Sequence, residues 1–116
     1  MNTIEEENTP ITVERDDAPD ISFLGVRIAG ASSSGNSANP EFSGSVGRRT
    51  LIRLYRTKAG KFVCERIERS NWQGERDQYD AHVCDNISEI FNFFGHGWLA
   101  KSLYAEAGIS AVVEVE

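Results

Sequence analysis

The side chains best suited to chemistry in this sequence are two cysteines and two histidines, Cys64, Cys84, His82 and His96. His82 and Cys84 are two positions apart, so on a strand they share a face, and Cys64 falls in a neighbouring predicted strand. Zinc accepts these ligand types, but no C-x-x-C or H-x-x-x-H spacing accompanies them. Two core thiols and two ordinary histidines explain the same residues. We therefore predict no metal ion and no cofactor.

The sequence contains no grouping adequate for catalysis. A cysteine nucleophile needs a base or a setting that favours the thiolate, and only the folded chain can bring His82 or His96 to a thiol. Asp77, Asp80 and Asp85 are spaced as on a solvated strand and its end, not as a dedicated carboxylate pair. We expect a protein without enzymatic activity and predict no catalytic residues.

Residues 48–61 contain six basic side chains and no acidic one. Such a stretch is either a solvated strand face or a patch that binds an anion or a nucleic acid. The six side chains are those of Arg48, Arg49, Arg53, Arg56, Lys58 and Lys61. We favour the solvated face and keep nucleic-acid or anion binding through these residues as the alternative function.

The net charge of −6 is concentrated at the start of the chain. Residues 1–20 hold seven acidic side chains and one basic side chain, whereas residues 21–116 hold 11 of each. The acidic segment has two prolines and too few apolar side chains to offset the entropy of ordering. We predict a disordered acidic arm, in which Ile11, Thr12 and Val13 have the residue types for a brief edge strand. The remaining residues form a single domain.

The clearest secondary structure in the sequence is a hairpin over residues 48–69. Its two predicted strands are rich in aliphatic, β-branched and aromatic residues, and they meet at a loop over residues 58–60. Gly60 supplies the left-handed third position that a three-residue loop needs. This loop sets Arg53 opposite Glu65, a favourable cross-strand pair, whereas a two-residue loop would oppose two arginines.

Both faces of this hairpin are apolar. An antiparallel sheet usually buries one face and exposes the other, so an apolar second face requires a cover. One face carries Ile52, Leu54, Phe62 and Cys64, and the other carries Leu51, Tyr55, Val63 and Ile67. The acidic arm, a second copy of the chain or a different protein would each supply the cover. We predict that a partner binds here, together with a tryptophan on the polar loop that follows. The predicted partner-binding residues are Leu51, Arg53, Tyr55, Val63, Ile67 and Trp72.

Two further strands flank the hairpin in the sequence. The first covers residues 21–29, where apolar side chains alternate, and a Gly/Ser-rich loop over residues 30–47 follows it. The second covers residues 77–84, with Tyr79, Ala81 and Val83 on one side.

Two short helices follow these strands. Asn86 is a good N-cap with Glu89 three residues later, and the next apolar residues recur at helical spacing. The segment Gly95-His96-Gly97 interrupts this pattern, and a rotated apolar stripe begins at Trp98 and ends before Gly108. The second stripe consists of Trp98, Leu99, Leu103, Tyr104 and Ala107. We predict an α+β fold: an antiparallel β-meander of about four strands, two short C-terminal helices packed on one face, and a short final strand over residues 110–115.

The order of these features resembles that of the EXLDI family of small bacterial proteins. The likeness lies in a strand ending in Leu-Tyr-Arg-Thr at 54–57, a glycine turn, a Lys-Phe-Val strand at 61–63, a tryptophan loop, a strand leading into a helix, and an acidic C-terminal strand. The chain ends in Val-Val-Glu-Val-Glu where the family has its namesake signature, and it has an acidic arm where many members carry a DNA-binding-like segment. Because the family has no established activity, the resemblance implies only a small protein of a bacterium or mobile element.

These observations together favour a small non-enzymatic protein-binding module that acts as an inhibitor or regulator. Its expected partner is another protein or a second copy of the chain. No run of residues approaches the roughly 20 apolar residues of a membrane span, and the acidic start differs from the basic start of a signal peptide. We expect a cytoplasmic protein without a membrane partner.

Overall fold

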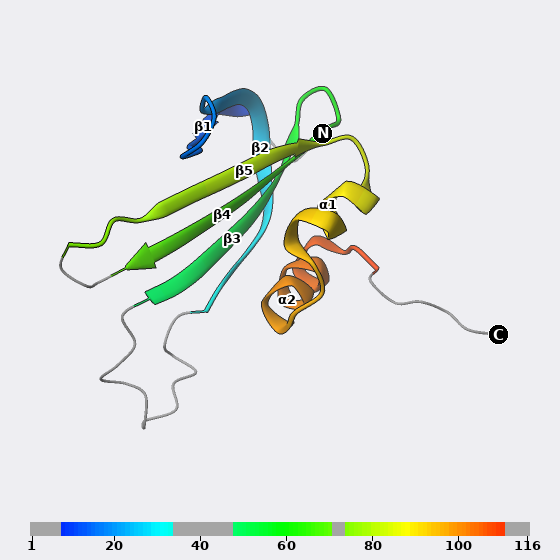
Figure 1. The fold of residues 1–116 in the computed structure, drawn as a ribbon. Helices are drawn as coiled ribbons and strands as arrows, with labels where there is room; N and C mark the ends of the chain where they lie inside the picture. Colours follow the sequence, from blue (N-terminus) through cyan, green and yellow to red (C-terminus); the bar gives the residue numbers. More distant parts are fainter. Residues whose placement is uncertain (1–7, 34–47, 71–73, 111–116) are drawn as a thin grey trace.

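The computed structural model describes residues 8–33, 48–70 and 74–110, which form one antiparallel sheet and two helices (Figure 1). Each strand pairs with the next one along the chain, so the sheet is a meander. The prediction of an α+β meander with two C-terminal helices is confirmed, with one strand more than expected. The elements are β1 (Thr9–Val13), β2 (Ile21–Ser32), β3 (Arg48–Thr57), β4 (Phe62–Ser70), β5 (Gln78–Cys84), α1 (Ile87–Phe94) and α2 (Trp98–Ala107).

The β3–β4 hairpin has the predicted loop and register. Arg53 pairs with Glu65 across the two strands. The Thr57 amide donates to the Lys61 carbonyl at 2.8 Å, which closes the three-residue loop. Gly60 has a φ of 93°, a left-handed conformation in which a side chain would be strained. Local turn chemistry therefore fixes which side chains of the hairpin share a face.

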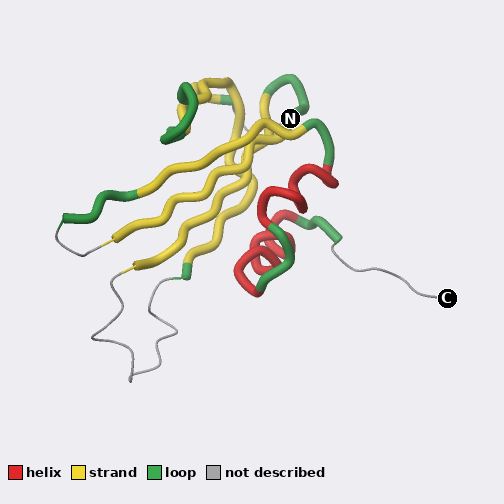
Figure 2. Tube along the Cα trace, in the orientation of Figure 1, coloured by secondary structure: helices red, strands yellow, loops and turns green. Residues whose placement is uncertain are grey.

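One face of the sheet packs against both helices (Figure 2). This is the face of Leu54 and Cys64, as predicted, and both side chains are fully buried. The helix ends also follow the sequence: the Asn86 side chain accepts from the Glu89 amide, and Gly108 ends α2 in the left-handed conformation. The buried residues of this first core are Ala29, Ile52, Leu54, Cys64, Cys84, Ile90, Ala100, Leu103 and Tyr104.

The opposite face has a core of its own, supplied by the start of the chain. Val13 of β1 is 1% exposed and packs with the buried residues Tyr55, Val63 and Ala81. The prediction that residues 1–20 are a disordered arm is therefore wrong for β1, whereas the edge strand for which Ile11, Thr12 and Val13 have the residue types is present. Alternating apolar residues let this short strand pair with the first half of β2 and turn its inner side to the sheet. Ile11, Ile21 and Phe23 are the partly buried residues around this second core.

The chain beyond β1 also closes part of the far edge of the sheet. The Asp16 amide donates to the Tyr79 carbonyl at 3.0 Å, and the Tyr79 amide donates to the Asp16 carboxylate at 2.9 Å. Asp16 therefore joins the first strand's end to β5, the last strand of the sheet. These bonds hold β1 across the second face.

The end of β2 differs from the prediction, and two other predicted segments lie largely outside the described residues. β2 continues through Ser32, so the prediction that a loop begins at Gly30 is wrong for residues 30–32. A register shift between Arg27 and Ala29 moves Ala29 onto the helix-covered face, where it is buried, and this shift lets the strand continue. The rest of the predicted Gly/Ser-rich loop and nearly all of the predicted final strand lie outside the described residues.

Candidate binding surface

The hairpin face that was predicted to bind a partner is mostly interior. Tyr55, Val63 and Ile67 are 6%, 0% and 3% exposed, so the prediction that they bind a partner is wrong; of the three covers considered, the acidic arm is the one present. The physical reason is β1, whose apolar side packs against Tyr55 and Val63. Leu51 and Arg53 are half-buried and line a shallow hollow beside the second half of β2. The sixth predicted residue, Trp72, lies outside the described residues.

A buried carboxylate explains why Tyr55 belongs to the interior. The Tyr55 hydroxyl donates to the Glu65 carboxylate at 2.7 Å, and Arg53 lies 3.5 Å from the same oxygen. Glu65 is itself buried, so its charge needs both partners. Burial, followed by the hydrogen bond to Glu65, raises the pKa of Tyr55 to about 12. The Tyr55–Glu65–Arg53 set is thus part of the second core, not a contact surface.

The predicted anion-binding residues do not form a common patch. Arg53 pairs with Glu65, and Lys61 lies 2.8 Å from Asp85, which raises the pKa of Lys61. Arg49, near the start of β3, and Lys58, in the loop that follows β3, are both exposed and roughly 30 Å apart at the rise of an extended strand. The Arg56 side chain is also exposed, and the Arg48 side chain lies outside the described part of the structure.

The most exposed large apolar side chain among the described residues is Trp98, at 66%. It stands at the first position of α2, beside a hollow of about 230 Å³ where the connection between α1 and α2 meets the sheet. We call this hollow the Trp98 groove. It is lined by Thr50, Ile52, Arg66, Phe94, Gly97, Trp98, Leu99 and Ala100.

The groove is held in shape by contacts between the sheet and α1, and by a contact between α2 and the connection that precedes it. The Arg66 side chain donates to the Phe93 carbonyl, and its guanidinium carbon lies 4.6 Å from the centre of the Phe93 ring. On the helical side, the Tyr104 hydroxyl donates to the Gly95 carbonyl at 2.7 Å. Burial raises the pKa of Tyr104 to about 12, so this donor stays protonated at neutral pH. The groove is therefore a preformed feature beside an exposed indole.

The residues with metal-binding side chains are partly brought together. The sulfur atoms of Cys64 and Cys84 lie 3.6 Å apart on neighbouring strands, and both cysteines are free and buried, as predicted. His82 is on the same face of β5 as Cys84. His96 is placed elsewhere, with its ring 5.0 Å from that of Phe91. The residue that lies near His82 and Cys84 is instead Glu89 of α1, whose only predicted role was in capping the helix.

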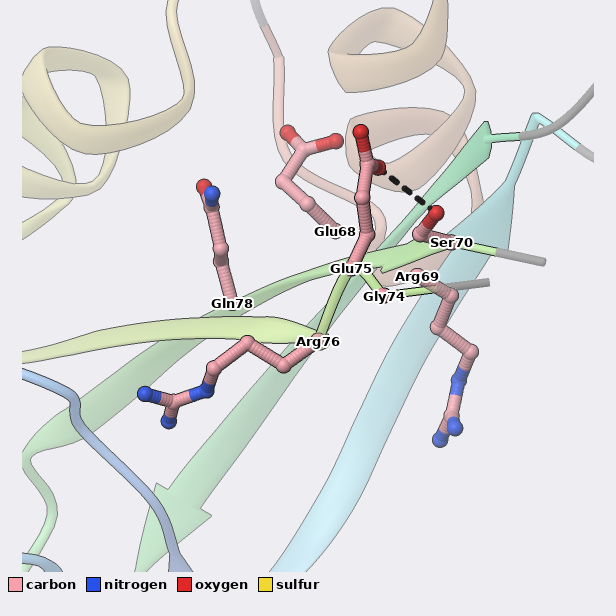
Figure 3. A pocket seen from close by; sticks show the side chains of 7 residues that line it. All are labelled: Glu68, Arg69, Ser70, Gly74, Glu75, Arg76 and Gln78. Atoms are coloured by element: carbon pink, nitrogen blue, oxygen red, sulfur yellow. Dashed lines mark hydrogen bonds between the residues drawn. The ribbon is translucent and has the colours of Figure 1, made fainter. Parts of the chain in front are cut away.

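A polar hollow with a volume of about 450 Å³ lies away from the Trp98 groove (Figure 3). It lies at the end of β4 and the start of β5. The carboxylates of Glu68 and Glu75 point the same way, whereas the guanidinium groups of Arg69 and Arg76 point away from them in two different directions. Ser70 donates to Glu75 at 2.8 Å, and Arg69 lies 3.2 Å from Asp77. Because the lining carries charges of both signs, and Arg69 and Arg76 are already paired with Asp77 and Asp16, this hollow is not built for one charged ligand.

No helix in the described part of the chain is long and apolar enough to span a membrane. Comparisons of this chain with family models, with curated proteins and with solved structures give no match, so the resemblance to the EXLDI family stays a prediction.

Proposed function

We propose that this chain is a small non-enzymatic protein-binding module whose contact surface is the Trp98 groove. The observation that carries the proposal is the exposed indole of Trp98 beside a hollow whose lining residues are mostly apolar. Tryptophan is strongly enriched among residues that dominate binding energy, because it buries a large area at little conformational cost. About two thirds of the Trp98 side chain is exposed, so most of the indole is not buried by the chain itself. Its position is best explained by contact with another molecule.

The chemistry of the lining indicates the kind of segment that would bind. Phe94 and Leu99 provide apolar surface beside Trp98, and Arg66 is the charged residue among those that line the groove. Its nearest carboxylate, on Asp80, is 3.9 Å away and largely exposed, so Arg66 is able to receive another carboxylate. We infer a partner protein with a segment that presents a large apolar side chain next to an acidic one. A module of this size would act on that partner as an inhibitor or regulator.

The state of the two thiols supports a non-enzymatic role. Burial is the main cause that raises the pKa of Cys64 and of Cys84, and it therefore disfavours the thiolate that a nucleophile requires. Two free thiols on neighbouring strands also favour the reducing cytoplasm as the location, because oxidising compartments promote disulfides. A bacterial or mobile-element origin rests on the EXLDI resemblance alone.

Nucleic-acid or anion binding has less support. Of the six basic residues of segment 48–61, Arg53 and Lys61 are held in ion pairs, and the exposed Arg49 lies far from the exposed Lys58. An anion site needs several cations or donors that converge on one point. Salt-dependent retention of the protein on heparin would revive this alternative.

The proposal is tested by photo-cross-linking from position 98. A photoreactive amino acid replaces Trp98 in the full chain, and the protein is irradiated in cells of its natural host. The matched control carries the same amino acid at Leu24, an exposed apolar residue of β2 that is absent from the lining of the groove. We expect a discrete cross-linked protein from position 98 that position 24 does not give.

Two results would overturn the proposal. One is a set of products from position 98 that equals the set from position 24. The other is a single product that consists of two copies of this chain, accompanied by a dimer mass in solution, because the occupant would then be the chain itself. Partners recovered from position 98 should contain an acidic residue beside the cross-linked apolar one.

A further inference from the structure

β5 and the first turn of α1 bring three different metal-ligating side chains to one point. Ligand atoms of His82, Cys84 and Glu89 all lie within 4.8 Å of one another. The three residues come from two elements joined by only two residues, Asp85 and Asn86. This cluster is separate from the Trp98 groove and shares none of its lining residues.

The local structure fixes the backbone of all three residues. His82 and Cys84 are two positions apart on β5, so their side chains project from the same face. Glu89 lies in the first turn of α1, where its amide is held by the Asn86 side chain at 3.0 Å. Cys84 is fully buried, Glu89 is half-buried and His82 is exposed. The cluster therefore has one anchored ligand and two that are able to adjust from the solvent side.

We propose that His82, Cys84 and Glu89 form a binding site for a divalent metal ion of the zinc type. Imidazole, thiolate and carboxylate are the three ligand classes that zinc takes in proteins, at about 2.0 to 2.3 Å. Two ligands of a tetrahedral ion are then roughly 3.5 Å apart, so the side chains must close by about 1 Å. Binding releases the Cys84 thiol proton to solvent, and the thiolate and carboxylate together neutralise the ion. The fourth position is left for water.

The neighbouring groups fit this assignment. One Glu89 oxygen accepts from the Asp85 amide at 2.8 Å, which orients the carboxylate and leaves its second oxygen for the ion. The Asp85 carboxylate is engaged by Lys61 and is not a ligand. Cys64 lies 3.6 Å from the Cys84 sulfur, within hydrogen-bonding distance, and we assign it as a partner of the ligand sulfur. A thiol next to a ligand sulfur stabilises the thiolate form.

The site is tested with Co²⁺, which reports its ligands by visible absorption, and with Zn²⁺ as a competitor. The full reduced protein is titrated with Co²⁺ alone. We expect a saturable complex of one ion per chain with a thiolate-to-cobalt charge-transfer band, which Zn²⁺ then abolishes. His82→Gln and Glu89→Gln should each raise the Kd at least tenfold, because each removes one ligand from an exposed or half-buried position that tolerates substitution. Glu89→Gln keeps an oxygen that is able to accept from the Asp85 amide.

The chain offers its own control in the second histidine. His96→Gln changes the same residue type outside the cluster and should leave the Kd unchanged. Cys64→Ala should keep the charge-transfer band, whereas Cys84→Ala should lose it; circular dichroism verifies that each variant is folded. The proposal is overturned if the parent gives no charge-transfer band, or if His82→Gln and His96→Gln weaken binding equally. It is also overturned if the band persists in folded Cys84→Ala and disappears in Cys64→Ala.

Discussion

Replacing Val13 with alanine tests whether the start of the chain is part of the folded core. Val13 is 1% exposed and packs against the second face of the sheet. The change removes two carbon groups, each of which contributes roughly 0.8 kcal/mol when buried, and it leaves a cavity. We therefore expect a loss of about 2 to 3 kcal/mol in the free energy of unfolding. A loss of that size lowers the Tm of a domain this small by roughly 8 to 12 °C.

The measurement is urea unfolding of the parent and the variant, monitored by circular dichroism, with the Tm as a second readout. Thr12→Ala is the matched control, because Thr12 is the neighbouring residue of β1 and is exposed. It should change the free energy of unfolding by no more than about 0.5 kcal/mol. If Val13→Ala behaves like Thr12→Ala, β1 is not docked on the sheet and the second face is open after all.

Three further substitutions test other parts of the fold. Leu54→Ala should lower the free energy of unfolding by about 2 to 5 kcal/mol in urea titrations, because Leu54 is fully buried beneath the helices; a near-neutral value would mean that the faces are inverted. Gly25→Ala should destabilise the protein and lower its Tm, since a Cβ at this position would meet the Arg56 carbonyl at 2.4 Å; an unchanged Tm would contradict the β2–β3 pairing. Tyr55→Phe should cost about 1 to 3 kcal/mol, because buried Glu65 loses a donor. Tyr55 has a pKa of about 12 in the folded chain and about 10 when unfolded, so its neutral form contributes stability that is complete below pH 10 and is lost as the pH rises to about 12. Unfolding titrations across that range should show a weaker pH dependence in Tyr55→Phe than in the parent.

Local chemistry made the hairpin and the helix ends predictable. A glycine at the third loop position selects the turn, the turn selects the register, and the register places Arg53 opposite Glu65. The Asn86 cap and the left-handed Gly108 are likewise decided by the residues on the spot. Each of these features depends on neighbours within a few positions along the chain.

The cover of the second face depends on contacts between distant segments. The apolar residues of that face showed that a cover was required, but not which molecule supplies it. In β1 the alternation of Ile11 and Val13 is only a few residues long and lies within a strongly acidic segment. The acidic composition of residues 1–20 therefore favoured a prediction of disorder over this short strand pattern. In the folded protein, packing against the second face of the sheet stabilises the strand.

The candidate sites were hidden for similar reasons. Trp98 shares a helical stripe with Leu103 and Tyr104, which are buried, but it lies in the first turn of α2 and is exposed. Hydrophobic periodicity indicates which face of a helix is apolar, but it does not indicate how far along the helix that face is covered by the rest of the protein. Glu89 has an obvious capping role, and only the short connection from β5 to α1 shows that it also lies beside Cys84.

The most direct test of the proposed function measures how strongly a partner identified by cross-linking binds to the immobilised protein. The parent, Trp98→Ala and Leu24→Ser are compared at equal loading, with both variants first shown to keep the parent Tm. If the Trp98 groove is the contact surface, Trp98→Ala should weaken binding by roughly 30-fold or more, the effect of losing a dominant interface residue, and Leu24→Ser should bind as the parent does. Equal binding of the parent and Trp98→Ala would show that the partner contacts another part of the protein and would contradict the proposal.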